Sequence, residues 1–258
     1  MSRMRRELAS VFLLVVAAAC LRFWNLWQME FKTDERQALE SALSILDSRP
    51  WITEAHWPQY SLRSSGGICM PPLFNSLCAL FWTLTRSPLG CAGIIAFLNV
   101  LSLPALYAWA RPRMGPSRAL LTIAWLALSP HAVVHSRKIW PQELLLPSLT
   151  LLVWGIAHWV SGKYWLAAGL MVWATLLVSQ LHLSGPVLLA AVAVSLGTST
   201  VMRLRRKQLR RLEPPRWWEL LNLASGMAAL LFFTVPYLRY LDNLSRNVKG
   251  GYPTAKGI

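Results

Sequence analysis

The chain has 258 residues, of which 55% are hydrophobic and only 14% are charged, and its mean hydropathy is +0.39. This composition is too apolar for an ordinary soluble domain and indicates an integral membrane protein. The formal net charge of +15 would also suit a nucleic-acid partner, but about half of the Lys and Arg residues flank hydrophobic runs in three short clusters. Membrane topology explains these clusters, so we expect no nucleic-acid partner.

Hydrophobic runs follow one another along the chain, and several approach the roughly 20 residues that a membrane-spanning helix needs. They lie at about residues 8–27, 70–85, 89–110, 119–135, 142–160, 164–180, 186–202 and 217–236. None has the alternating pattern of a transmembrane β-strand, so we predict an all-α fold, a polytopic transmembrane helical bundle. We expect one membrane domain over residues 1–258, divided into a first transmembrane helix (1–27), an outer catalytic loop with juxtamembrane helices (28–69), the remaining membrane helices (70–236) and an outer tail (237–258).

The basic clusters orient these predicted helices, because positively charged loops stay in the cytoplasm. The clusters are Arg3, Arg5 and Arg6, then Arg111, Arg113 and Arg118, then Arg203, Arg205, Arg206, Lys207, Arg210, Arg211 and Arg216. Between the first outer loop and the second cluster, the chain can cross the membrane only once, yet two hydrophobic runs lie in this interval. One of them should therefore lie along the membrane or dip into it without crossing. We assign this to the run 70–85. The outer face then holds three polar segments: Asp34 and Glu35, residues 136–138, and residues 180–182.

The first outer loop is acidic. Six of the eleven acidic residues follow the first hydrophobic run directly, namely Glu30, Asp34, Glu35, Glu40, Asp47 and Glu54. Carboxylates gathered at one membrane exit indicate chemistry or cation binding. The alternative is that they only solvate a loop or cap a helix, since Asp is common near a helix start.

Several other motif classes are missing from the sequence. It contains no glycine-rich phosphate loop and no internal repeat, which argues against a soluble nucleotide-sugar or ATP enzyme. The cysteines lack paired metal-ligand spacing, so buried packing is expected for them. Arg22, near the outer end of the first helix, is expected to extend its side chain to the membrane surface.

Four segments together resemble the polytopic C-type glycosyltransferase superfamily, in particular its protein O-mannosyltransferase and aminoarabinose-transferase-like branch. They are LRFWNLWQMEFKTDE (21–35), MPPLFNSL (70–77), LSPHAVVHSRKIWPQELL (128–145) and SQLHLSG (179–185). Each motif alone is weak, whereas their order and spacing across about 160 residues are moderately specific.

The resemblance implies that a sugar moves from a polyprenyl-phosphate-linked donor to a lipid, glycan or protein acceptor on the outer face, with inversion at the sugar carbon. An acceptor hydroxyl is a poor nucleophile, and a nearby carboxylate can accept its proton as the new bond forms. Asp34 is our candidate for this base. Glu35 would position the acceptor or help to bind a divalent metal ion.

The leaving lipid phosphate needs positive partners, for which we select Arg137 and Lys138. The alternative for both is a position at the membrane surface without a ligand, and Glu143 could pair with either cation. Gln180 and His182 are further substrate-binding candidates, and His182 could share a metal ion with Glu35 because some family members use such a histidine at a metal site. No cofactor is predicted apart from this ion.

Family members usually continue beyond this length with further membrane helices, so we expect the chain to be the amino-terminal part of a longer architecture. A minimal enzyme and a non-catalytic subunit are the alternatives. A polyprenyl-lipid-binding transporter or scaffold remains the rival function. The resemblance and the general style of the sequence favour the bacterial inner membrane.

Overall fold

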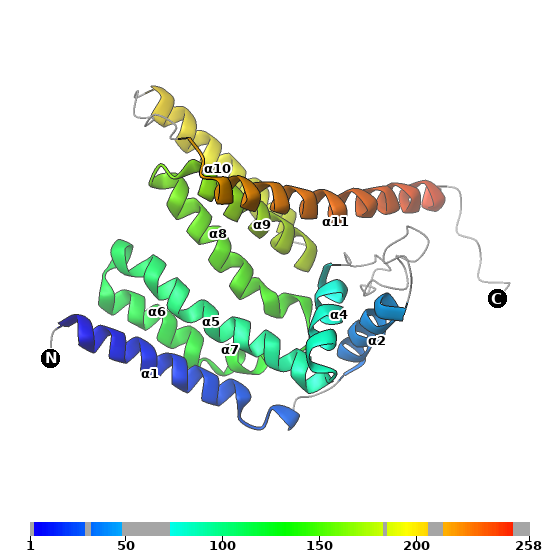
Figure 1. Ribbon diagram of the computed structural model, residues 1–258, viewed down its shortest axis with the longest axis horizontal. Helices are drawn as coiled ribbons and strands as arrows, with labels where there is room; N and C mark the ends of the chain where they lie inside the picture. The colour runs from blue at the N-terminus through cyan, green and yellow to red at the C-terminus, as the bar shows by residue number, and fades with distance from the viewer. Residues whose placement is uncertain (1–2, 29–31, 48–72, 183–184, 206–213, 250–258) are drawn as a thin grey trace.

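The structure is a computed structural model that describes residues 3–28, 32–47, 73–182, 185–205 and 214–249. These residues form helices and no strand, which confirms the all-α prediction (Figure 1). Glu30, Glu54 and much of the expected outer loop lie outside the described residues. In chain order the elements are α1 (Arg3–Phe23), η1 (Leu26–Gln28), α2 (Thr33–Asp47), α4 (Leu73–Thr85), α5 (Pro88–Met114), α6 (Pro116–Leu128), α7 (Pro130–His135), η3 (Pro141–Leu144), α8 (Leu145–Val160), α9 (Tyr164–Leu181), α10 (Gly185–Arg205) and α11 (Trp217–Lys249).

Four helical segments are long and apolar enough to cross a membrane. They are Pro88–Met114, Pro141–Val160, Tyr164–Leu181 and Trp217–Val235. A lipid bilayer leaves backbone polar groups without partners unless a helix pairs them internally, which explains why the apolar runs adopt this form. The chain is therefore an integral membrane protein.

Four of the expected membrane segments, 8–27, 70–85, 119–135 and 186–202, are not among these four. The helix α4 has 13 residues, so at 1.5 Å per residue it reaches only about 20 Å and is too short to cross the roughly 30 Å hydrocarbon layer. Its length agrees with the prediction that segment 70–85 does not cross. The helix α1 has 21 residues but carries charged residues near both ends, and its crossing stays a prediction.

The run 119–135 was expected to form one helix, and this expectation is wrong. The chain leaves the helical conformation at Ser129, where ψ is 123°, so α6 and α7 are separate. The cause is Pro130, because a proline disfavours helical backbone in the residue before it and has no N–H to donate. The carbonyl of Leu126 therefore loses the donor that an unbroken helix would supply.

Arg22 replaces this missing donor. Its guanidinium donates to the carbonyl oxygens of Leu126 at 2.8 Å and Ala127 at 3.0 Å, and more weakly to Ala18 on its own helix at 3.3 Å. The side chain is completely buried, so the prediction that it extends to the membrane surface is wrong. A cation at the carboxyl end of a helix also interacts favourably with the helix dipole. Arg22 thus holds the end of α6, from which α7 begins.

The last helix is longer than predicted. We expected a helix over 217–236 followed by a tail, but α11 continues to Lys249, so the first part of the expected tail is helical. The helix continues past Pro236, the last residue of the apolar run, although a proline inside a helix removes one backbone hydrogen bond. Residues 250–258 lie outside the description.

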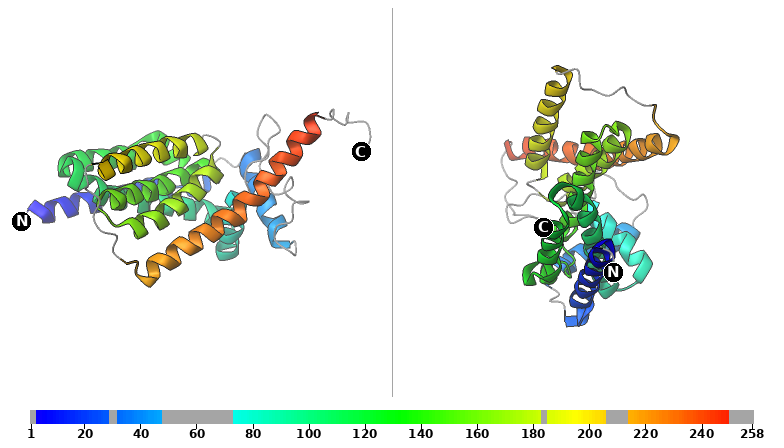
Figure 2. Two further views of the ribbon diagram at one scale, coloured as in Figure 1. Left: turned by 90° about the horizontal axis from the view of Figure 1, so that it is seen from above. Right: turned by 90° about the vertical axis from the view of Figure 1, so that its left-hand side faces the viewer.

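The helices pack as a series of layers rather than around one centre. Figures 1 and 2 show α5 between α1 and α8, and α9 between α8 and α11, in agreement with the helix pairs that contact each other. Glycines allow the closest of these approaches. A side chain at Gly155 of α8 would press on Met171 of α9, and one at Gly169 of α9 would press on Asn222 of α11. Small residues at helix contacts are a usual feature of membrane bundles.

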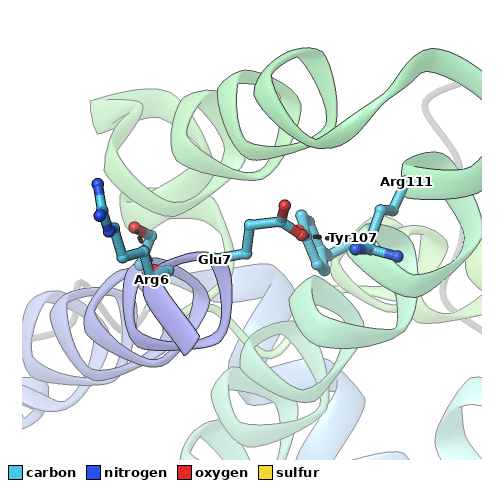
Figure 3. Close-up of polar contacts among 5 residues, drawn as sticks. Arg6, Glu7, Tyr107 and Arg111 are labelled. Carbon is cyan, nitrogen blue, oxygen red and sulfur yellow. Dashed lines mark hydrogen bonds and ion pairs between the residues drawn. The ribbon is translucent and has the colours of Figure 1, made fainter. Parts of the chain in front are cut away.

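An ion pair joins α1 to α5 at the end of the bundle that carries the first two basic clusters (Figure 3). Glu7 of α1 accepts from Arg111 Nε at 2.8 Å and from the Tyr107 hydroxyl at 3.4 Å. The amino end of α1 and the carboxyl end of α5 consequently lie together. This agrees with the prediction that both clusters are on the same side of the membrane.

Candidate functional site

The three polar segments that we expected to share one face lie at the same end of the bundle. One buried hydrophobic cluster contains Leu39 of α2, Ile139 of the turn before η3, and Leu181 of α9. The first turn of α4 and the last turn of α9 also meet in this region, where the two helices contact each other (Figure 1). We call this end of the bundle the site end.

Asp34 and Glu35 occupy the first turn of α2, where negative charge is favoured by the helix dipole. Asp34 is exposed and makes no hydrogen bond or ion pair with another described residue. Glu35 is only 1% exposed. Successive helix positions point about 100° apart, which explains why neighbouring carboxylates have opposite surroundings. Glu35, and not Asp34, therefore faces the protein interior.

A backbone hydrogen bond fixes the side chain of Glu35. Its Oε2 accepts from the N–H of Lys32 at 3.1 Å. An acidic residue in the third helical position commonly reaches back in this way to a donor that the helix leaves unpaired. The apolar face of α2, which includes Ala38, Leu39 and Ile45, packs on α4 and holds the helix start in place.

The second buried carboxylate of the site end belongs to Glu143 in η3, which is 8% exposed. Its Oε1 lies 3.3 Å from Nδ1 of His135 at the end of α7. The ring of His131, four residues earlier and hence on the same helix face, stacks on His135 with 4.2 Å between centroids. Asn99 of α5 donates to the backbone carbonyl of Glu143 at 2.8 Å and so holds η3 against the bundle.

Electrostatic interaction connects Glu143 with the other elements of the site. Its carboxyl group is close enough to Lys138 and His131 for attraction, and close enough to Glu35 for repulsion. Two carboxylates from elements more than 100 residues apart in the chain thus share one partly dehydrated region with an ammonium group. Such a region is costly to form, so it is a candidate for ligand binding.

Arg137 and Lys138 lie in the turn between α7 and η3. The guanidinium of Arg137 donates from Nη2 to the backbone carbonyl of Asn25, just after α1, while its Nε is buried without a hydrogen-bond partner. Asn25 has a φ of 49°, in the left-handed region that Asn tolerates. The Nζ of Lys138 lies 5.6 Å from the ring centroid of Trp140. Arg137 is thus partly committed to fixing the end of α1.

Several buried amide groups complete the site end. Gln180 in the last turn of α9 is 3% exposed and Asn75 in the first turn of α4 is 1% exposed. Among the described residues, the Oε1 atoms of Gln180 and Gln142, and both amide atoms of Asn75, have no hydrogen-bond partner. An unpaired buried polar atom costs about 1–3 kcal/mol. Groups of this kind in a native protein point to a bound ligand or ordered water.

His182 follows α9 directly, with an extended backbone and a half-buried side chain. Its carbonyl accepts from the N–H of Gly185 at 2.9 Å, which turns the chain toward α10. Within the described ranges, no group of three or more His, Cys, Asp and Glu side chains is arranged to hold a metal ion. The metal site expected from Glu35 and His182 gains no support from this geometry.

Sequence reasoning missed the pairing of His135 with Glu143. We considered that Glu143 could pair with Arg137 or Lys138, yet its hydrogen bond is to the histidine. The two residues lie on either side of the turn at residues 136–138. Asn75 and Asn99, isolated amides in otherwise apolar runs, were also overlooked, although a polar residue buried in a membrane helix is a functional candidate by default.

Comparison with known proteins adds no relative. No protein-family model matches the chain, and neither the curated proteins nor the solved structures contain a match.

Proposed function

We propose that the protein is a membrane glycosyltransferase that moves a sugar from a polyprenyl-phosphate-linked donor to an acceptor on the outer face of the bacterial inner membrane, with inversion. The observation that carries the proposal is the meeting of buried carboxylates, basic side chains and unpaired amides at one end of an apolar helical bundle. A charged sugar-phosphate with a long apolar tail requires this combination of surroundings. The motif resemblance supplies the class of reaction.

The proposed reaction needs one proton acceptor and one charge stabiliser. The acceptor oxygen attacks the sugar carbon, the bond from that carbon to the phosphate oxygen breaks, and the acceptor proton passes to Asp34. The electron pair of the broken bond leaves with the polyprenyl phosphate. Asp34 suits this role because its exposed carboxylate has no competing partner among the described residues.

Lys138 and Arg137 are the proposed partners of the lipid phosphate. A fixed cation stabilises the charge that the leaving group gains in the transition state. A guanidinium suits forked contacts and an ammonium suits single contacts, although Nη2 of Arg137 already donates to Asn25. The nearby Glu143 offsets part of the positive charge of these side chains.

The buried amides are the proposed recognition groups for sugar hydroxyls. Gln180, Gln142 and Asn75 each hold at least one unpaired polar atom, and a hydroxyl both donates and accepts. Sugar binding would supply these missing partners. Discrimination by such groups is strong, because a ligand without the matching hydroxyl leaves them unpaired again.

The rival function is a non-catalytic polyprenyl-lipid-binding transporter or scaffold. It would use the same cations and amides but not the carboxylate of Asp34. The exposure of Asp34 and its lack of described contacts are compatible with this function.

The deciding experiment measures release of free polyprenyl phosphate from a panel of polyprenyl-phosphate sugars, with the purified chain in lipid. We expect Asp34→Asn to lower the release rate by about 100-fold or more, since a positioned base contributes typically 10²–10⁴-fold. The matched control is Asp47→Asn, which removes an exposed carboxylate from the other end of α2 and should leave the rate unchanged. Equal release rates for wild type and Asp34→Asn would refute the assignment of Asp34 as the catalytic base. Donor binding without release by either protein favours the rival function.

A further inference from the structure

A second candidate binding site lies at the opposite end of the bundle from the site end. The turn between α8 and α9 meets the start of α11 there and encloses a hollow. Its chemically informative lining consists of Lys163, Tyr164, Trp165, Arg216, Trp218 and Glu219. The helix α8 separates this hollow from η3, so it is distinct from the proposed sugar-transfer site.

Backbone contacts give this hollow a defined shape. Gly162 adopts a φ of 82°, which a residue with a side chain rarely does. The backbone N–H of Lys163 donates to the backbone carbonyl of His158 at 2.9 Å. The ring of Tyr164 packs edge-on against Trp159 with 5.0 Å between centroids. These contacts fix the positions from which Lys163 and Tyr164 project.

The hollow carries a net positive charge, because two basic side chains and one carboxylate line it. Lys163 and Arg216 are exposed, and neither forms an ion pair with a described residue. The one carboxylate in the lining, Glu219, accepts from the backbone N–H of Arg216 at 2.9 Å and serves the start of α11. The hollow that Arg111 lines beside α1 differs in this respect, because Arg111 is already paired with Glu7.

The aromatic side chains place this hollow at the level of lipid headgroups. Tyr164, Trp165 and Trp218 have apolar rings with one polar atom, the type of side chain that collects at membrane interfaces. The basic clusters assign this end of the bundle to the cytoplasm, where the leaflet is rich in anionic lipids. Two unpaired cations between aromatic rings match a phosphate group attached to an apolar tail.

We propose that this hollow binds the phosphate of an anionic phospholipid headgroup through Lys163 and Arg216. The aromatic rings contact the lipid beside the headgroup, and the lipid joins the α8–α9 turn to the start of α11. The proposal does not depend on the sugar-transfer reaction, and its failure would leave that function untouched.

The test uses the full chain in detergent and native mass spectrometry to count retained phosphatidylglycerol and phosphatidylcholine. Wild type should retain phosphatidylglycerol preferentially, and Lys163→Gln with Arg216→Gln should weaken this retention by about 30-fold, from the usual contribution of two basic residues near an anionic surface. The matched control is Arg5→Gln with Arg118→Gln, which removes the same charge from exposed positions in two other basic clusters. Thermal unfolding of all three proteins checks that the exposed substitutions leave the fold intact.

The control separates a built site from general surface charge. Equal weakening in both double variants overturns the proposal, as does equal retention of the two lipids by wild type. Addition of inorganic phosphate distinguishes the sources of the phosphate group. If millimolar phosphate binds at Lys163 and Arg216 while phosphatidylglycerol is not retained, the hollow takes a free anion and the lipid proposal is wrong.

Discussion

Replacement of Arg22 by Met should destabilise the protein by about 3 kcal/mol. The substitution removes the donors of two carbonyl oxygens, that of Ala127, which is buried, and that of Leu126, which is partly buried. Each carbonyl left unpaired costs about 1–3 kcal/mol, so the loss is about 2–6 kcal/mol. Removal of a dehydrated charge offsets part of this cost, and the lower half of the range is therefore expected.

The free energy of unfolding can be measured by titration of mixed micelles with sodium dodecyl sulfate. A loss of about 3 kcal/mol corresponds to a lower melting temperature by about 6–12 °C for a chain of this size. Arg22→Lys keeps the charge but lacks the forked donors, so about half of the loss is expected. Both variants should also slow polyprenyl phosphate release, because α7 with His135 begins at the end of α6 that Arg22 holds.

A double-mutant cycle tests the physical reason. Pro130→Ala supplies the N–H that Pro130 lacks, so the Leu126 carbonyl gains a possible donor of its own. In this background Arg22→Met should cost about 1 kcal/mol less than in wild type. If Arg22→Met leaves stability within about 0.5 kcal/mol of wild type, or if its cost is unchanged by Pro130→Ala, the assignment of Arg22 as the partner of these carbonyls is refuted.

Further outcomes follow from the same structure. A methyl group at Gly185 would meet the backbone carbonyl of Val178, so Gly185→Ala should lower stability by about 1–3 kcal/mol, whereas Gly197→Ala in the same helix meets open space and should be neutral or stabilising by up to about 1 kcal/mol. Equal melting temperatures for these variants would contradict the close approach. Asn75→Leu should raise the free energy of unfolding by about 1 kcal/mol, because both buried amide atoms lack partners among the described residues. The same substitution should weaken donor binding. A lower free energy of unfolding would show that the amide is paired. Glu143→Gln keeps the shape of the side chain but removes its charge. The rate of polyprenyl phosphate release should fall by about 10-fold, because the position of its histidine partner changes. An unchanged rate at all donor concentrations would show that Glu143 has no role in the reaction.

The chemistry of single segments could be read from the sequence. Apolar runs of about 20 residues predict membrane helices because burial of backbone groups in lipid is a local requirement. The same reasoning found that segment 70–85 is short, and it directed attention to the acidic first turn of α2. The break before Pro130 was also readable, since proline acts on the residue before it, but the apolar pattern across 119–135 concealed it.

Contacts between distant segments could not be read in this way. Whether Asp34 or Glu35 faces inward depends on which face of α2 packs on α4, and charge alone does not distinguish adjacent carboxylates. Arg22 was expected at the membrane surface because it lies near the outer end of the first helix, whereas two of its partners lie more than 100 residues away on α6. Glu143 forms its hydrogen bond with His135, on the other side of the turn at residues 136–138.

The sequence by itself determined that this chain is a helical membrane protein with acidic and basic residues at the ends of its helices. These properties follow from hydrophobicity and charge, which act residue by residue. The tertiary structure decided which charges are buried together, which carbonyls Arg22 satisfies and which amides remain unpaired at the site end. Such pairings depend on the packing of helices far apart in the chain, where a shift of one helical turn would exchange every partner.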